Sequence, residues 1–420
     1  MSKAQLLWAT FSPNGFIRLP AYRKLGYQMS IFTTKRAIMK IVADENIPLV
    51  EAFFSRLGEV VRLPGRNMTA ADVRDADALI VRSVTKVNAA LLNGSKVKFV
   101  GTCTIGVDHL DQDYLDVKAI GWSSAPGCNA NSVVEFVYAA LCHLNINWLP
   151  VKFGIIGCGN VGGLLYKRLK AQGVDVRCYD PNLNLAQNSD LTSLEEVLAC
   201  DVISMHTPLV TTGPHPSFHL IGRNELLQLK KGAVLINCGR GPVIDNQELL
   251  DVLNERSDLN VVLDVWEPEP DISLELLDKV LLGSPHIAGY SYDGKLNGTE
   301  MIYQALCRHL DQKPKSSLAE LVPPLANNQL RVDANIDQPN NIFTIVKALT
   351  KQVYDIAADD ARLRALAANA LAGEVVFGEG FDGLRKHYPV RREFHNYQVH
   401  LENISEADKH WLQVLGFHCV

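Results

Sequence analysis

The chain has 420 residues, of which 47% are hydrophobic and 21% charged, and its formal net charge is −5. This length allows two or three domains with cores of their own, and the acidic balance argues against nucleic acid or an anionic membrane as a partner. The nine cysteines form no C-x-x-C pair and no zinc-like cluster, and no apolar run approaches the length of a membrane span. We therefore expect a cytoplasmic globular protein with reduced thiols and no metal site.

The first 38 residues have an unusual composition, with six Lys or Arg and no Asp or Glu. A basic leader without acids is typical of a transit peptide. The segment that begins at Met39, however, resembles the opening strand of a domain. We therefore favour a non-native or disordered leader over residues 1–38, with a transit peptide as the alternative.

Between Met39 and about Pro126, short apolar runs alternate with helix-like stretches, which is typical of a parallel sheet covered by helices. A capping-box pattern at Ser132 and Glu135 then predicts an apolar helix from Ser132 to about Leu144. The expected strands cover residues 40–43, 60–63, 78–81 and 99–102, and a further helix is expected over residues 48–57.

Residues 151–180 are the most informative stretch. An apolar run leads into the G-C-G-N-V-G turn of residues 157–162, and a helix-like segment to Gln172 and a second apolar run follow. This order is the dinucleotide-binding fingerprint, in which the glycines permit a tight turn, the approach of a pyrophosphate and close packing of helix on strand. The residues expected at the cofactor are Gly157, Gly159, Asn160, Val161, Gly162 and Asp180.

Asp180 indicates which cofactor is bound. It follows Gly162 by 18 residues (180 − 162), close to the spacing of about 20 expected for the acid that binds the adenosine ribose. A carboxylate accepts hydrogen bonds from two free hydroxyls but repels a 2′-phosphate. The sequence therefore favours NAD over NADP, although Arg177 on the same strand weakens this preference slightly.

Four further apolar runs predict strands over residues 202–206, 234–237, 261–265 and 280–282. Polar segments at or just after the last three of these strand ends contain Arg240, then Glu267 and Glu269, then His286. Open α/β sheets place their sites at the carboxyl ends of the strands. We therefore expect Arg240, a glutamate and His286 to meet at one edge of the sheet.

This combination suits the oxidation of a 2-hydroxy acid by NAD. An arginine binds the substrate carboxylate through two parallel bonds. A histidine accepts the hydroxyl proton near neutral pH, and an acid beside it orients the ring. Singly, Arg240 could form a surface ion pair and Glu269 could occupy a turn. Their order behind a dinucleotide-binding segment favours the catalytic interpretation.

From about Met39 to Leu310 the chain resembles the D-isomer-specific 2-hydroxyacid dehydrogenases. The resemblance implies that Arg240 binds the carboxylate, that His286 is the acid/base and that Glu269, which directly precedes the second proline of the E-P-E-P segment, is its partner rather than Glu267. It implies an α/β fold with two Rossmann-like domains and a C-terminal α+β dimerisation domain. The domains are expected at residues 39–138 with 286–312 (substrate), 139–285 (NAD-binding) and 321–420 (dimerisation).

The same resemblance places further residues at the NAD site. His206, beside one of them, is expected to be structural. The positions that correspond to the family's cofactor contacts are Thr207, Cys238, Gly239, Arg240, Asp264 and Gly289.

Five segments, VADENIP, VRSVTKVN, GTCTIGVDHLD, HTPLVTTGPHPSFHL and HIAGYSYDGK, resemble a branch of the family that acts in vitamin B6 biosynthesis, as do ADDARLR and FDGLRKHYPVRREF in the tail. This closer resemblance implies a homodimer that oxidises 4-phospho-D-erythronate to 2-oxo-3-hydroxy-4-phosphobutanoate. It also implies substrate contacts from Ser83, Thr104 and Tyr290. Arg82, beside Ser83, offers a guanidinium for the phosphate, with an ion pair as the alternative.

Two other functions remain open at this point. A 3-phosphoglycerate dehydrogenase shares the Arg, Glu and His, although the tail does not resemble the regulatory domain of the longer forms. An NAD-sensing corepressor on the same fold is the alternative from another class, since such a protein can retain all three residues. Measurable turnover would separate the enzyme from the corepressor.

Overall fold

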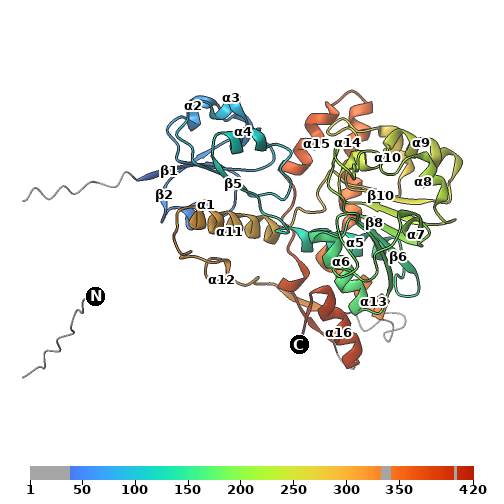
Figure 1. The fold of residues 1–420 in the computed structure, drawn as a ribbon. Helices are drawn as coiled ribbons and strands as arrows, with labels where there is room; N and C mark the ends of the chain where they lie inside the picture. Colours follow the sequence, from blue (N-terminus) through green and yellow to red (C-terminus); the bar gives the residue numbers. More distant parts are fainter. Residues whose placement is uncertain (1–37, 333–341, 402–403) are drawn as a thin grey trace, which may run out of the picture. The chain divides into compact units, whose positions relative to one another are not determined.

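The computed structural model describes residues 38–332, 342–401 and 404–420. The leader predicted over residues 1–38 therefore lies, apart from Ile38, outside the described residues. From Met39 to Val420 the chain forms one compact unit, built from two parallel sheets and a smaller third sheet (Figure 1). The contacts between residues do not separate this unit into smaller domains, so the domain limits expected from the sequence stay predictions.

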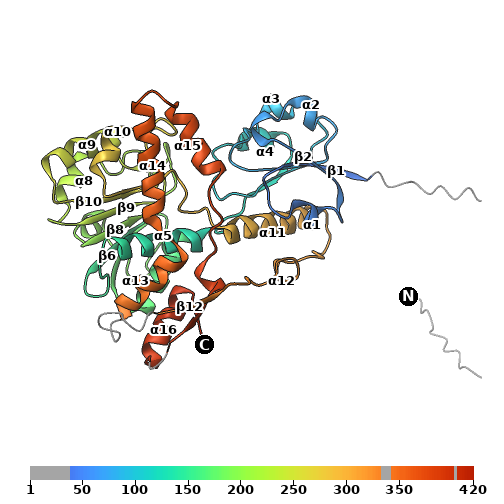
Figure 2. The ribbon, with the colours of Figure 1, turned by 180° about the vertical axis from the view of Figure 1, so that it is seen from behind.

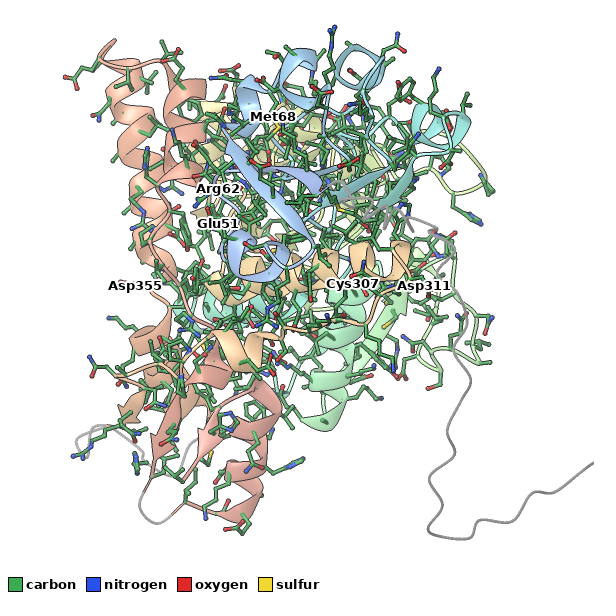
Figure 3. All side chains as sticks on the ribbon, turned by 90° about the vertical axis from the view of Figure 1, so that its left-hand side faces the viewer. Glu51, Arg62, Met68, Cys307, Asp311 and Asp355 are labelled. Atoms are coloured by element: carbon green, nitrogen blue, oxygen red, sulfur yellow. The ribbon has the colours of Figure 1, made fainter. Side chains whose placement is uncertain are left out.

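The first sheet is parallel, with the strand order β2-β1-β3-β4-β5. The strands predicted over residues 78–81 and 99–102 are confirmed with those bounds. An exposed ion pair joins Arg62 on β2 to Glu51 on α1 (Figure 3). The elements of this part are β1 (Met39–Asp44), α1 (Val50–Phe54), β2 (Gly58–Leu63), α2 (Ala70–Val73), β3 (Ala78–Val81), α3 (Ala89–Leu92), β4 (Phe99–Thr102), α4 (Gln112–Val117) and β5 (Gly121–Ser123).

The second sheet is also parallel, with the order β11-β10-β9-β8-β6-β7. Its inner strands β8, β9 and β10 are almost fully buried because helices cover both faces of the sheet. Its elements are β6 (Lys152–Ile156), α6 (Asn160–Ala171), β7 (Asp175–Tyr179), α7 (Leu194–Leu198), β8 (Val202–Met205), α8 (Arg223–Gln228), β9 (Val234–Asn237), α9 (Asn246–Glu255), β10 (Asn260–Leu263), α10 (Leu274–Lys279) and β11 (Leu282–Gly283).

Two long helices carry the chain from one sheet to the other. Helix α5 (Ala130–His143) leads from β5 to the second sheet, and α11 (Tyr292–His309) returns to pack on the first sheet (Figure 2). The expected capping box is wrong, because the helix begins at Ala130 and Ser132 lies inside it. The Ser132 hydroxyl donates to the carbonyl of Ala288, and the buried Glu135 carboxylate accepts from the backbone N–H of Phe394.

The C-terminal region packs against the second sheet and the α5 helix. Side chains of α13, α16 and β13 join the core that includes α5 and α6, and Leu363 and Phe381 join the core on the other face of the sheet. The small third sheet has the order β12-β13-β14. The elements are α12 (Leu318–Leu321), β12 (Gln329–Arg331), α13 (Ile342–Val353), α14 (Ile356–Leu371), α15 (Phe377–Lys386), β13 (Gln398–His400), α16 (Glu406–Leu415) and β14 (His418–Cys419).

Other boundaries expected from the sequence are adjusted, and the strand expected over residues 261–265, for example, is Asn260–Leu263. The last strand lies at Leu282–Gly283 rather than residues 280–282, because Val280 ends helix α10 with its N–H bonded to the carbonyl of Leu276. The helix expected over residues 48–57 is limited to Val50–Phe54. All nine cysteines are free and seven of them are buried. Among the described residues, no helix combines the length and hydrophobicity that a membrane crossing requires.

Candidate active site

The glycine-rich turn after β6 has room for a Cβ atom at Gly159 but not at Gly157 or Gly162. Gly157 has a φ of 85°, a conformation that favours glycine, and a Cβ atom there would stand 2.9 Å from the backbone nitrogen of Thr207. A Cβ at Gly162 would stand 2.0 Å from the carbonyl oxygen of Gly157, so this glycine lets α6 pack on the turn. No atom lies within 4 Å of the same position at Gly159. The open side at the amino end of α6 fits a pyrophosphate.

Asp180 lies beside this turn. Its carboxylate accepts hydrogen bonds from the backbone N–H groups of Cys158, at 2.9 Å, and Asn182, at 3.0 Å. Arg177 donates to Asp175 on its own strand, at 2.5 Å. An acid fixed at the turn, with the nearby arginine already paired, suits a ribose with free hydroxyls better than one with a 2′-phosphate.

His286 and Glu269 form a hydrogen-bonded pair at the carboxyl edge of the second sheet. The Nδ1 atom of His286 lies 2.8 Å from Oε2 of Glu269, and the backbone N–H of Trp266 donates to Oε1 at 3.0 Å. Burial alone would raise the pKa of Glu269, but the charge and hydrogen bond of His286 and the bond from Trp266 outweigh it, so the pKa is lowered. A carboxylate fixed in this way holds the Nδ1 proton and leaves Nε2 for a substrate.

Glu267, the rival acid, has a different partner. Its carboxylate lies 2.9 Å from Nε2 of His219, in the long loop before α8, and Nδ1 of His219 lies 3.2 Å from Asp245. The geometry therefore joins Glu269, not Glu267, to His286.

Asp264 fixes the loop that carries His286. Its buried carboxylate accepts hydrogen bonds from the Ser284 hydroxyl (2.6 Å) and the backbone N–H groups of Ile287 (2.7 Å) and Ala288 (3.0 Å). The backbone of His286 is left-handed, with a φ of 56°. This conformation costs a non-glycine residue about 1–3 kcal/mol, and the bonds to Asp264 on both sides of His286 offset that cost.

Arg240 reaches from the loop after β9 towards the first sheet. One guanidinium nitrogen donates to the carbonyl of Gly239 at 2.9 Å, and another lies 3.3 Å from the exposed carboxylate of Asp108. A Cβ atom at Gly106 would stand only 2.4 Å from this second nitrogen. Sequence reasoning missed the contacts of Gly106 and Asp108 with Arg240, although both lie in the GTCTIGVDHLD segment that carried the family resemblance.

The predicted substrate contacts of the first sheet lie at the carboxyl ends of β3 and β4. Arg82 binds the buried carboxylate of Asp44 through two bonds, at 3.0 and 3.2 Å, so the ion pair left open by the sequence is present. Ser83 is exposed. The Thr104 hydroxyl donates to the carbonyl of Gly106 at 3.2 Å, which places Thr104 beside Arg240.

Among the described residues, the imidazole ring of His206 has a single hydrogen-bond partner, a neighbouring hydroxyl. Its Nε2 atom lies 2.9 Å from the Ser204 hydroxyl, and its Nδ1 atom is buried without a partner among the described residues. Burial lowers the pKa of His206 to about 3. Thr207, the next residue, donates its hydroxyl to the carbonyl of Ile156 at 3.2 Å, beside the glycine-rich turn.

Comparison with known proteins agrees with this arrangement. Residues 148–288 match the NAD-binding domain of the D-isomer specific 2-hydroxyacid dehydrogenases, and residues 321–416 match a domain of unknown function, DUF3410. A protein of Cellvibrio japonicus, an erythronate-4-phosphate dehydrogenase, is 73% identical over 382 residues, which cover 91% of this chain and all of that protein. The chain belongs to the erythronate-4-phosphate dehydrogenase family. Another erythronate-4-phosphate dehydrogenase, from Pseudomonas syringae, is 48% identical over 90% of this chain and 99% of its own length.

Solved structures support the fold of this family. The NAD-bound 3-phosphoglycerate dehydrogenase of Entamoeba histolytica aligns with a TM-score of 0.56 and 23% identity, over 66% of this chain and 96% of its own. The D-lactate dehydrogenase of Aquifex aeolicus aligns with a TM-score of 0.54 and 22% identity, over 65% and 95%. The predicted pair of Rossmann-like units and the NAD-binding unit are thereby confirmed for this erythronate-4-phosphate dehydrogenase family member.

Proposed function

We propose that the chain is an NAD-dependent dehydrogenase that oxidises 4-phospho-D-erythronate to 2-oxo-3-hydroxy-4-phosphobutanoate in vitamin B6 biosynthesis. The observation that carries the proposal is the 2.8 Å bond between His286 and Glu269 at the carboxyl edge of an NAD-binding sheet, with Arg240 on a neighbouring loop. The identity of 73% to the Cellvibrio japonicus protein supports this choice of substrate over 3-phosphoglycerate.

The residues at the glycine-rich turn fit NAD. The open position at Gly159 and the amino end of α6 receive the pyrophosphate, and Asp180 binds the ribose hydroxyls. Asp264 acts through the loop that it fixes. When bound there, NAD would supply the acceptor for the hydride of substrate carbon 2. The remaining residues at the cofactor are Gly157, Asn160, Val161, Gly162, Thr207, Cys238, Gly239, Arg240 and Gly289.

Three side chains carry the chemistry of the substrate. Arg240 binds the carboxylate, which replaces Asp108 as the partner of its outer nitrogen. The free Nε2 atom of His286 accepts the proton of the 2-hydroxyl group. Glu269 stabilises the imidazolium that forms, because it remains charged beside the ring.

The phosphate end of the substrate extends towards the first sheet. Arg82, Ser83 and Thr104 line this side, and Tyr290 lies on the segment just after His286. The ion pair with Asp44 occupies Nε and one Nη of Arg82, and the remaining N–H groups can still donate to a phosphate oxygen.

The protein acts as a cytoplasmic homodimer through its C-terminal region. Leu371, Val375 and Val376 expose apolar side chains at the connection between α14 and α15, which supports a partner surface there. The helix α5 is buried from Ser132 to Cys142 within one chain, so it offers little surface to a partner. Light scattering on Leu371→Asp combined with Val376→Asp tests this: a variant that stays dimeric places the interface elsewhere.

Turnover of a panel of 2-hydroxy acids by the purified protein with NAD tests the proposed reaction. We expect 4-phospho-D-erythronate to give the highest kcat/KM, with 3-phosphoglycerate and D-erythronate at least about tenfold lower. Arg240→Lys should be nearly as damaging as removal of the side chain, because lysine keeps the charge but loses the planar fork. Equal use of D-erythronate and its 4-phosphate would refute the substrate assignment, and binding of NAD without any turnover would favour the corepressor.

A further inference from the structure

Arg385 connects the C-terminal region with the two loops that carry Glu269 and His286. It lies on α15, which Figures 1 and 2 show on the side of α14 that faces the first sheet. The helix packs closely on the segment after Glu269, since a Cβ atom at Gly378 would stand 2.6 Å from a carboxylate oxygen of Asp271. The Arg385 guanidinium lies 5.7 Å from the centre of the Tyr290 ring. Helix α15 therefore forms one wall of the active site.

The ion pairing of Arg385 is incomplete. Its partner is Asp382, at 3.7 Å, and Asp382 is bound more closely by Arg66, at 2.9 Å. The Nε atom of Arg385 is buried and has no hydrogen-bond partner among the described residues. A guanidinium withdrawn from water is normally held by short bonds to a carboxylate or a phosphate. Arg385 therefore has donors available for a ligand.

Lys295, on α11, approaches the same tyrosine. Its Nζ atom lies 5.0 Å from the centre of the Tyr290 ring, and the ion pairs of the described residues do not include it. Burial, followed by the charges of Arg82 and Arg391, lowers the pKa of the Lys295 ammonium group. Arg391 itself is buried, and its Nε and Nη1 atoms have no partner in the described part of the chain.

Two cationic side chains, Lys295 and Arg385, thus lie beside the Tyr290 ring, and among the described residues neither has an ion pair shorter than 3.7 Å, although the charge of Glu269 acts on Arg385. A bound anion stabilises such a cluster, because each cation regains the favourable interactions it lost with the solvent. The substrate carboxylate is already assigned to Arg240 on another loop. The remaining anion of a phosphorylated 2-hydroxy acid is its dianionic phosphate, at the end of the molecule remote from that carboxylate.

We propose that Lys295 and Arg385 bind the phosphate of the substrate beside Tyr290, so that the C-terminal region helps to determine which 2-hydroxy acid is oxidised. This inference rests on the proposed function and extends the phosphate site beyond Arg82 and Ser83. The partner-poor guanidinium of Arg385 supplies a planar fork, and the Lys295 ammonium supplies a compact charge.

The variants Arg385→Gln and Lys295→Gln test the inference. The readout is the ratio of kcat/KM for 4-phospho-D-erythronate to that for D-erythronate. Each substitution should lower this ratio about 10- to 100-fold, as expected for the loss of a hydrogen bond to a charged group. Lys386→Gln is the matched control, because Lys386 is exposed on the same helix. It should leave the ratio within about twofold of wild type.

Other results would overturn the inference. An equal decrease in kcat/KM for both acids would mean that the two residues act through Tyr290 or Glu269 and not on the phosphate. A higher Kd for NAD would mean that they bind the cofactor. If Lys295→Gln does not fold, Lys295→Met and Arg385→Gln carry the same test. If the wild-type protein oxidises neither acid, the proposed function fails. Calorimetric titration of inorganic phosphate into the protein–NAD complex then decides, since unchanged binding by both variants refutes the inference and lost binding supports it.

Discussion

Glu269→Gln tests the catalytic pair most directly. One carboxylate oxygen of Glu269 accepts a hydrogen bond from the backbone N–H of Trp266, and the other accepts from Nδ1 of His286. A glutamine side chain has one carbonyl oxygen, which can accept only one of these two hydrogen bonds. Its NH₂ group can only donate, so it faces the other N–H donor without forming a bond. The pair therefore loses a bond, and His286 loses the negative charge beside its ring.

The size of the effect follows from these two losses. A hydrogen bond to a charged group contributes about 1.5–3 kcal/mol, which corresponds to about 10- to 150-fold in rate. Loss of the tautomer that leaves Nε2 free removes the base, and general acid–base catalysis is typically worth about 10²–10⁴-fold. We therefore expect kcat to fall about 10²- to 10⁴-fold, while NAD binds as in wild type because Glu269 does not lie at the glycine-rich turn.

The assay is the initial rate of NADH formation with 4-phospho-D-erythronate at saturating NAD, together with the melting temperature of each variant. Glu267→Gln is the matched control, since Glu267 pairs with His219 and not with His286. It should retain kcat within a few-fold of wild type. A Glu269→Gln enzyme with kcat within about threefold of wild type, or two equally impaired variants, would refute the assignment of Glu269.

Three further outcomes follow from the structure. Gly106→Ala should lower kcat/KM about tenfold or more, because the new methyl group displaces Arg240. Gly383→Ala, which has open space at its Cβ position, should leave kcat/KM unchanged. The same kcat/KM for both variants would contradict the role given to Gly106. Asp108→Asn should lower KM up to about fivefold, because an exposed ion pair contributes about 0.2–1 kcal/mol and Asp108 competes for Arg240; an unchanged KM would refute the competition. The pKa of His206 is about 3 in the folded chain and about 6.5 in the unfolded chain, so the unfolded chain binds the proton more readily. The free energy of unfolding should therefore decrease as the pH falls below about 6.5, by up to about 2 kcal/mol at about pH 5. Urea unfolding of His206→Gln should lack this acid-dependent part, and an identical pH dependence in both proteins would exclude it.

Local patterns predicted the parts of the fold that local sequence determines. The buried strands at 78–81, 99–102 and 234–237 were predicted with their observed bounds, because an apolar run between helices has few other solutions in an α/β protein. The glycine-rich turn was equally predictable, since Gly157 has a positive φ and a Cβ atom at Gly157 or Gly162 would collide with backbone atoms. The acid partner of His286 was predicted through the family resemblance, and the structure brings the two residues together.

Features that depend on distant parts of the chain could not be predicted. Ser132 and Glu135 match a capping box, but their side chains bond to Ala288 and Phe394, more than 150 residues away in sequence. The partner of Arg82 is Asp44, 38 residues earlier, so only the fold distinguishes an ion pair from a free phosphate ligand. Arg385 likewise lies near Tyr290 only because α15 packs against the loops that follow β10 and β11.

The return of helix α11 to the first sheet has a consequence for synthesis on the ribosome. Ile302, Tyr303 and Leu306 of this helix complete the core on one face of a sheet whose last strand ends at Ser123. The interval from Ser123 to Ile302 is 179 residues (302 − 123). At about 5–20 residues per second, translation of this interval takes roughly 9–36 s. During that time the nascent amino-terminal sheet lacks the residues that cover one of its apolar faces, so its core stays incomplete until nearly three-quarters of the polypeptide is made.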